Sequence, residues 1–260
     1  HSARTDARFT DKDSTMNDTS NPYATPASAL QPTQAVPPVI GDYDFRIGDV
    51  ISEAWAKIKG VKGILIGAFV VYSVVIQTIT FILTLLFGGI GLMSEADPIA
   101  FAVGQMIASL VATAVGYPFF TGLTMIGIRR AADQPATFNE MFNYFGMLVP
   151  LLLTGLLMML MVYVGFFLLI IPGLYLSVAY MLALPLVAER GLTPWQALET
   201  SRKAISRHWF KVFGLLLVLS LLMLVSMIPL FIGLIWTGPL FVVSMGILYR
   251  TIFGVRPLGN

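Results

Sequence analysis

The sequence contains no cysteine and only two histidines, His1 and His208. Without cysteine the chain has no disulfide, no thiolate metal ligand and no cysteine nucleophile, and two distant histidines do not make a metal-binding cluster. The motifs of phosphate-binding loops, serine hydrolases and zinc proteases are also missing. We therefore expect no metal site, no cofactor and no enzymatic activity.

Charge is scarce as well, because only 12% of the residues are charged while 57% are hydrophobic. The mean hydropathy is +0.81, far above the range of soluble proteins. The composition therefore predicts an all-α protein, a polytopic bundle of transmembrane helices.

The first 41 residues differ from the rest, since they are polar, rich in Pro, Ser, Thr and Ala, and without apolar periodicity. We predict that residues 1–41 are disordered and that residues 42–256 form the transmembrane domain. The N-terminal segment has no signal-peptide core, so the first span is expected to direct insertion. Because the chain opens on His, one interpretation places the natural start at Met16, with residues 1–15 non-native or upstream of it.

Apolar runs of about 20 residues, the length that crosses a hydrocarbon core, occur six times after the N-terminal segment. The boundary between the third and fourth runs is the least distinct, because only Pro172 and Gly173 indicate a turn there. A single kinked helix is the alternative at this boundary. The predicted spans are residues 63–91, 99–128, 147–170, 172–188, 212–230 and 233–251.

The lysines and arginines after the N-terminal segment predict the orientation, because cytoplasmic loops retain these residues. Under the six-span model none lies in an outer loop, and the outer connections carry only Glu95 and Asp97. Both termini are therefore expected in the cytoplasm, in a multi-pass protein of a bacterial inner membrane. The basic residues are Arg46, Lys57, Lys59, Lys62, Arg129, Arg130, Arg190, Arg202, Lys203, Arg207, Lys211, Arg250 and Arg256.

An amphipathic segment precedes each odd-numbered span, at residues 48–60, 136–142 and 193–211. The second and third begin with capping boxes, Thr137 with Glu140 and Thr193 with Gln196. Pro118, Pro172 and Pro239 mark the even-numbered spans, and we place these helix-breaking turns or kinks near their outer ends. We infer three repeats of an interfacial amphipathic helix followed by a helical hairpin.

Basic and aromatic residues gather on these amphipathic segments, as expected for helices in the membrane interface. In residues 193–211 the apolar face holds Trp195, Leu198, Ile205 and Trp209, with Arg202 in its middle. Arg202 either snorkels or pairs with Glu199, or it contacts a lipid phosphate. The predicted lipid-binding or interfacial residues are Trp55, Lys57, Lys59, Trp195, Arg202, Lys203, Arg207, Trp209 and Lys211.

The segment from Ile170 to Lys211, most specifically from Pro172 onward, resembles a family of bacterial integral membrane proteins. Its "IIPGLYLSVAYMLALPLVAERGLTPWQALETSRKAISRHWFK" is similar to YciC-like proteins and to the membrane domain of some glycerophosphoryl diester phosphodiesterases. The resemblance covers most of residues 42–256 and implies a six-helix inner-membrane protein. The chain has no room for the soluble phosphodiesterase domain, so that activity is not implied.

Two functional hypotheses follow from these features. In the first, a non-enzymatic protein contacts anionic lipid, a protein partner or a second copy of itself through cytoplasmic amphipathic helices, in envelope organisation. In the second, proline-marked helices form a permease or channel for an uncharged or amphiphilic solute. The deep polar residues Gln77 and Gln105 are more typical of helix packing than of a substrate site, and we expect no nucleic-acid partner.

Overall fold

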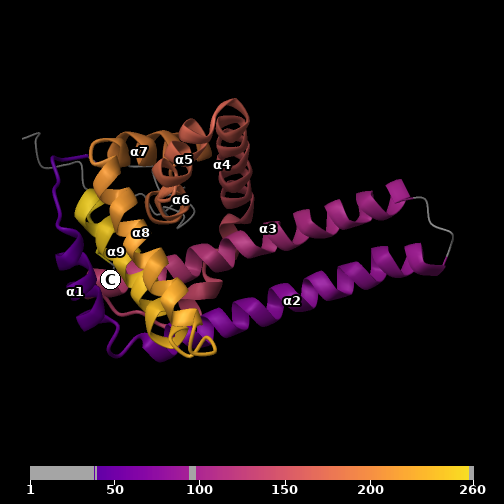
Figure 1. Ribbon diagram of the computed structural model, residues 1–260, viewed down its shortest axis with the longest axis horizontal. Helices are drawn as coiled ribbons and strands as arrows, with labels where there is room; N and C mark the ends of the chain where they lie inside the picture. Colours follow the sequence, from indigo (N-terminus) through magenta and orange to yellow (C-terminus); the bar gives the residue numbers. More distant parts are fainter. Residues whose placement is uncertain (1–37, 39, 94–97, 258–260) are drawn as a thin grey trace, which may run out of the picture. The chain divides into compact units, whose positions relative to one another are not determined.

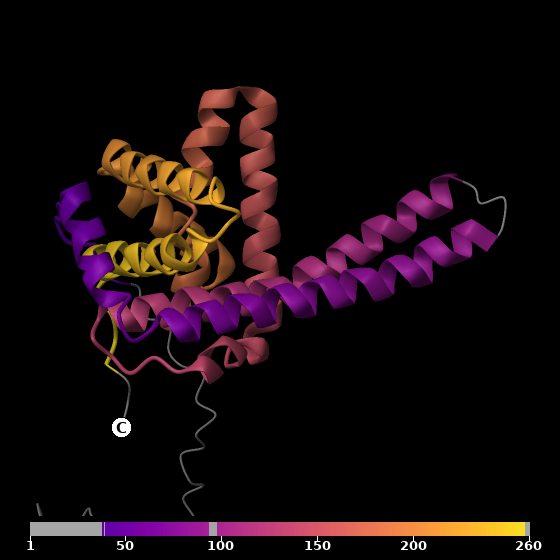
Figure 2. The ribbon, with the colours of Figure 1, turned by 60° about the horizontal axis from the view of Figure 1, so that its bottom comes forward.

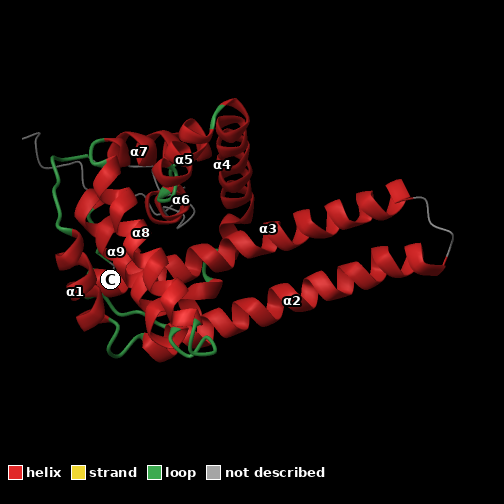
Figure 3. Cartoon of the chain, viewed as in Figure 1, coloured by secondary structure: helices red, strands yellow, loops and turns green. Residues whose placement is uncertain are grey.

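The computed structural model describes residue 38, residues 40–93 and residues 98–257. All regular structure in this part is helical, and six stretches are long and apolar enough to cross a membrane, as predicted (Figures 1 and 3). Of the predicted disordered segment 1–41, all but residues 38, 40 and 41 lies outside the described residues. The helices are α1 (Ile47–Lys57), α2 (Lys62–Met93), α3 (Pro98–Ala131), α4 (Leu148–Leu168), α5 (Ile170–Ala179), α6 (Ala183–Arg190), α7 (Pro194–Ser206), α8 (Trp209–Met227) and α9 (Leu234–Phe253), with the short 3-10 helices η1 (Phe138–Phe142) and η2 (Phe145–Met147).

The long helices pair as three antiparallel hairpins, α2 with α3, α4 with α5, and α8 with α9. Figures 1 and 2 together show that the hairpins diverge from one another and that the far halves of α2 and α3 extend away from the other helices. Side chains there are apolar and exposed, such as Phe81 at 64% and Leu110 at 49%. Such surfaces are expected where a helix faces hydrocarbon rather than water.

The third and fourth spans are separate helices, because α4 ends at Leu168 and α5 folds back against it. A Cβ built on Gly165 would lie 3.0 Å from the Cα of Gly173, so the two helices are in close contact. The turn is not at Pro172 and Gly173, as predicted, but at Leu169, whose backbone is extended. In a continuous helix the carbonyl of Leu168 would accept from the N–H of residue 172, which proline lacks, and the proline ring would clash with that carbonyl. Helix α4 therefore ends at Leu168, one turn before Pro172. Pro172 then fits the first turn of α5, where backbone N–H groups have no intrahelical partner.

Pro118 and Pro239 lie inside helices rather than at turns. Pro239 is near the start of α9, as expected, but Pro118 lies twenty residues after the start of α3 and so is not near its outer end. The prediction for Pro118 was wrong because it followed the flanking "GYPFF" pattern, although the predicted span 99–128 already starts nineteen residues before Pro118.

Helices α3 and α9 cross near the end of α3, where glycines bring the two backbones together. A Cβ built on Gly246 would lie 2.3 Å from the carbonyl oxygen of Gly127, and one on Gly127 would lie 2.6 Å from that of Val242. Small residues allow this approach in membrane proteins. Around the crossing the described core consists mostly of buried Leu, Ile, Val and Ala side chains.

The amphipathic segments form different structures. Residues 47–57 and 194–206 are α-helices, whereas residues 138–142 form a 3-10 helix. The box predicted at Thr137 is not formed, because Glu140 binds Arg129 and Tyr144 instead. The middle segment therefore differs from the other two, and the threefold repeat stays a prediction.

Candidate functional site

Helix α7 begins where its sequence predicts. The backbone N–H of Thr193 donates to Oε1 of Gln196 at 3.2 Å, the capping box is formed, and Pro194 occupies the first helical position. Leu198 and Ile205 are buried and anchor the helix. The face that remains free carries the polar and basic residues that the sequence singles out.

Arg202 pairs with Glu199, which is the simpler of its two predicted roles. Its Nε and Nη2 donate to the two carboxylate oxygens of Glu199 at 2.9 and 2.8 Å, and Nζ of Lys203 lies 3.3 Å from Oε1 of Glu199. The hydrogen bond from Arg202 is the main cause that lowers the pKa of Glu199 to about 2. Glu199 therefore stays ionised and neutralises much of the charge of Arg202.

Arg207 and Lys211 hold the segment that precedes α1. Nη1 of Arg207 donates to the carbonyl of Gly41 at 2.9 Å, and Lys211 forms an ion pair with Asp44. The hydroxyl of Tyr43 donates to the carbonyl of Ala204 at 2.9 Å, and burial raises the pKa of Tyr43 to about 12. Arg207 and Lys211, predicted as lipid contacts, thus make contacts within the chain.

The predicted single helix over residues 193–211 is interrupted between Ser206 and Trp209. Trp209 begins α8, stacks on Phe213 and donates its indole N–H to the carbonyl of Tyr175 at 3.2 Å. Trp195 is 58% exposed and does not share the buried face of Leu198 and Ile205. The predicted common face of the two tryptophans was wrong, because a helical wheel assumes that the helix continues.

On α1, Trp55 is 49% exposed and Lys59, just beyond the helix, is exposed. Lys57 instead forms ion pairs with Asp133 and, at 3.7 Å, with Glu53. The Lys57 hydrogen bond lowers the pKa of Asp133. Of the predicted residues of this segment, Trp55 and Lys59 therefore remain available to a partner outside the chain.

Ion pairs gather where α3 and α9 end and α2 begins. Nη1 and Nη2 of Arg250 donate to Glu53 at 2.7 and 2.9 Å, and the Arg250 guanidinium also binds the carbonyl of Ala131. Nearby, hydrogen bonds through Gln134 and Arg256 connect Arg129 to Glu189. We call this region the polar base, and define it as Glu53, Lys57, Arg129, Asp133, Glu140, Glu189, Arg190 and Arg250.

Glu189 is, with Glu140, one of the two most enclosed acids of the polar base, and each has its side chain 7% exposed. Glu189 accepts hydrogen bonds from Arg190 Nε at 2.8 Å, from the Tyr249 hydroxyl and from the backbone N–H of Arg256 at 2.6 Å. Nη2 of Arg190 donates to the carbonyls of Phe253 and Gly254. Since every bond joins parts of one chain, the role of the pair is to fasten the end of α9 to α6.

Sequence reasoning found the cations of the polar base but missed the acids that reach them from distant positions in the sequence. Glu53 and Arg250 are 197 residues apart, and Glu189 reaches Arg256 across 67. No local spacing encodes such pairs. The signal available in the sequence was that acidic residues lie near helix ends that also carry arginines.

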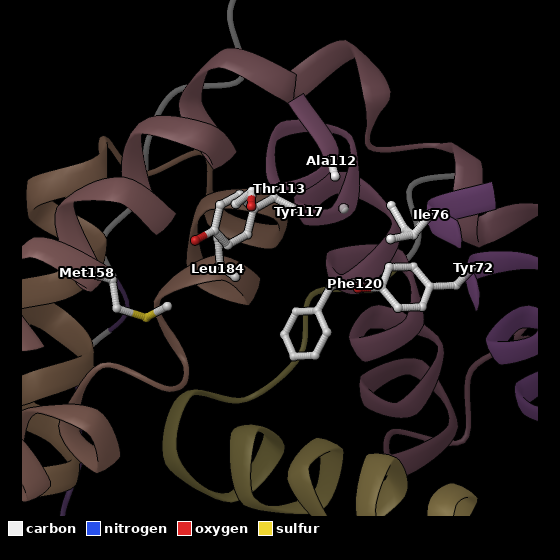
Figure 4. A pocket seen from close by; sticks show the side chains of 9 residues that line it. Tyr72, Ile76, Ala112, Thr113, Tyr117, Phe120, Met158 and Leu184 are labelled. Carbon is white, nitrogen blue, oxygen red and sulfur yellow. The ribbon is translucent and has the colours of Figure 1, made fainter. Parts of the chain in front are cut away.

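A hollow of about 380 Å³ lies between α2, α3, α4 and α6 (Figure 4). Its wall is mostly apolar and aromatic, with the polar hydroxyls of Tyr72, Thr113 and Tyr117. Phe120 and Met158 close other sides of it. Such a lining suits an apolar chain or an amphiphile rather than an ion.

Chemistry at these sites is limited by their residues. Within residues 40–93 and 98–257, no group of three or more His, Asp or Glu is placed to hold a metal ion. Each acid of the polar base is paired with an arginine or a lysine.

Comparison with models of protein families, with curated proteins and with solved structures gives no match for this chain. The site is therefore interpreted from its own residues, and membership of the YciC-like family stays a prediction.

Proposed function

We propose that this chain is a non-enzymatic protein of a bacterial inner membrane, and that α1 and α7 contact anionic lipid from the cytoplasmic side, in envelope organisation. One observation carries the proposal. Each of these segments presents an exposed tryptophan and an exposed lysine, Trp55 with Lys59 and Trp195 with Lys203, and Lys203 stays 63% exposed although it also pairs with Glu199 at 3.3 Å. Tryptophan and lysine together are typical of the membrane interface.

The electrostatic contribution of this surface is modest and additive. A basic residue near an anionic leaflet contributes about 1 kcal/mol. Arg202, Arg207 and Lys211 are engaged by Glu199, Gly41 and Asp44, so their neutralisation would disturb the fold as well as the surface. The informative residues are therefore Lys59 and Lys203.

The test is lipid retention, measured by native mass spectrometry after extraction in mild detergent. The double variant Lys59→Gln, Lys203→Gln should lose most bound anionic lipid, by about thirtyfold for two cations. The matched control Lys59→Arg, Lys203→Arg keeps the charge and should retain lipid as the wild type does. Equal retention by the neutral variant would contradict the lipid proposal, and a protein that co-purifies with both variants would favour a protein partner.

The hollow beside Tyr117 favours a second candidate, a permease for an amphiphilic solute. The aliphatic packing of the described core speaks against a continuous polar path. Thr113→Leu would fill the hollow, so solute uptake that falls in this variant while lipid retention stays unchanged would support the permease.

A further inference from the structure

The connection between α8 and α9 lies next to a residue that the six-span topology places on the opposite side of the membrane. Nζ of Lys62, at the start of α2, lies 3.9 Å from the centroid of the Trp236 ring, near the start of α9. In the six-span prediction Lys62 precedes the first span on the cytoplasmic side, while the turn before α9 is on the outer side. Two groups 3.9 Å apart cannot lie on opposite sides of a hydrocarbon core of ~30 Å, so one of these two placements is wrong.

The far end of α9 contacts the same region. Arg250 binds Glu53 of α1 and the carbonyl of Ala131, the last residue of α3. Because α2 and α3 are antiparallel, Ala131 and Lys62 belong to the same end of that hairpin. Helix α9 has 20 residues and is about 30 Å long. Even so, both of its ends contact this end of the hairpin, because Trp236 contacts Lys62 and Arg250 contacts Ala131. Its middle crosses α3 at Gly127, a few residues before the end of that helix.

The turn itself is built for surroundings without water. The side chains of Ile228, Leu230, Phe231 and Ile232 are 54–84% exposed. The backbone N–H groups of residues 228, 230–232 and 234–237 all donate to carbonyls of the same turn, and Pro229 has none to donate. A turn in hydrocarbon needs this internal pairing, because no water is present to satisfy the backbone.

The backbone conformation of the turn agrees with this environment. Leu230 and Phe231 have φ angles of 50° and 64°, a left-handed region that favours glycine or asparagine. A turn in water normally uses Gly, Asn or Asp at such positions. Here apolar side chains occupy strained positions, which is consistent with a requirement for hydrocarbon contact.

We propose that the α8–α9 hairpin does not cross the membrane but lies in the leaflet on the side of Lys62, with its exposed apolar face in the acyl chains of that leaflet. A hairpin that returns to its own side leaves both chain termini on one face, so the distribution of lysine and arginine is still satisfied. The proposal is independent of lipid binding by α1 and α7.

The absence of native cysteine allows a direct test with cysteine pairs in membranes of the full chain. The pair Lys62→Cys, Trp236→Cys should cross-link in high yield with a bifunctional maleimide of about 10 Å span, as should the positive control Glu53→Cys, Arg250→Cys. The pair Lys62→Cys, Phe101→Cys, from opposite ends of the α2–α3 hairpin, should not. Failure of the first pair while the positive control reacts would overturn the proposal.

A single variant keeps the proposal testable where the pair disturbs the contact. Thr237→Cys, directly after Trp236 and so at the level of the Lys62 ammonium, is offered to a membrane-impermeant maleimide in inside-out and right-side-out vesicles. Reaction in inside-out vesicles, as for Lys59→Cys, supports the proposal. Reaction in right-side-out vesicles, as for Asp97→Cys, overturns it.

Discussion

The α2–α3 and α8–α9 hairpins are similar in composition and different in structure. Both consist of apolar helices that satisfy the length and hydropathy of a span. Helix α2 has 32 residues, about 48 Å, and its first residue, Lys62, contacts Trp236. Helix α9 has 20 residues and contacts the same end of the molecule through both Trp236 and Arg250. Hydropathy thus indicates that a helix is immersed in lipid, whereas tertiary contacts decide whether it crosses.

The largest expected effect is at the contact that seats α9 on α3. Gly246→Ala adds a Cβ that would lie 2.3 Å from the Gly127 carbonyl oxygen, and should lower the free energy of unfolding by about 3 kcal/mol. Gly238→Ala, in the same helix but with open space around it, should change stability by less than about 1 kcal/mol. Thermal unfolding in detergent measures both, and equal effects would mean that α9 is not seated at this crossing.

The second effect concerns the end of α9. Glu189→Gln removes the charge that pairs with Arg190 in a nearly enclosed site, and should cost about 3 kcal/mol of unfolding free energy. Glu199→Gln breaks a more exposed pair and should cost no more than about 1 kcal/mol. Denaturation in detergent distinguishes them. A larger loss at Glu199 would contradict the assignment of the enclosed pair as the fastener of α9.

Acid should weaken the surface of α7 and the polar base together. The pKa of Glu199 is lowered from 4.5 to about 2, and those of Glu53 and Asp133 are lowered mainly by hydrogen bonds from Arg250 and Lys57. A lowered folded-state pKa gives stability that is complete above the unfolded value and is lost as the pH falls through the folded value. The melting temperature should therefore decline between about pH 4.5 and 2. The Glu199→Gln variant should show a shallower decline, and an identical profile would exclude Glu199 as a contributor.

The smallest effect is at the α8–α9 turn. Lys62→Gln removes the cation from the Trp236 ring and should cost about 0.5–1 kcal/mol. Lys59→Gln, three residues earlier at an exposed position, should leave the unfolding temperature unchanged. Tryptophan emission during unfolding follows this change, and a double variant with Trp236→Leu should show no further loss from Lys62→Gln.

The six apolar helices were predictable because each is a long hydrophobic run, and the predicted span 63–91 agrees closely with α2. The capping box of Thr193 and the Arg202–Glu199 pair were predictable because they depend on residues three positions apart. The capping box predicted from local spacing at Thr137 did not form, because Arg129 binds Glu140 instead.

The rest depends on contacts between distant residues. Nothing near Glu53 in the sequence indicates Arg250, and nothing near Trp236 indicates Lys62. The break at Leu169 follows from the missing N–H of Pro172, but its exact position depends on how α5 packs on α4. The prediction that placed the α8–α9 turn on the outer side used hydropathy and charge alone, and so it did not include these contacts between distant residues.

The most direct test of the account is the side of the membrane that Lys59 faces, because the lipid proposal requires α1 on the cytoplasmic side. A single Lys59→Cys in the cysteine-free chain is offered an impermeant maleimide in intact and in permeabilised cells. The account predicts reaction only after permeabilisation, with Asp97→Cys reacting in both. Reaction of Lys59→Cys in intact cells would contradict it.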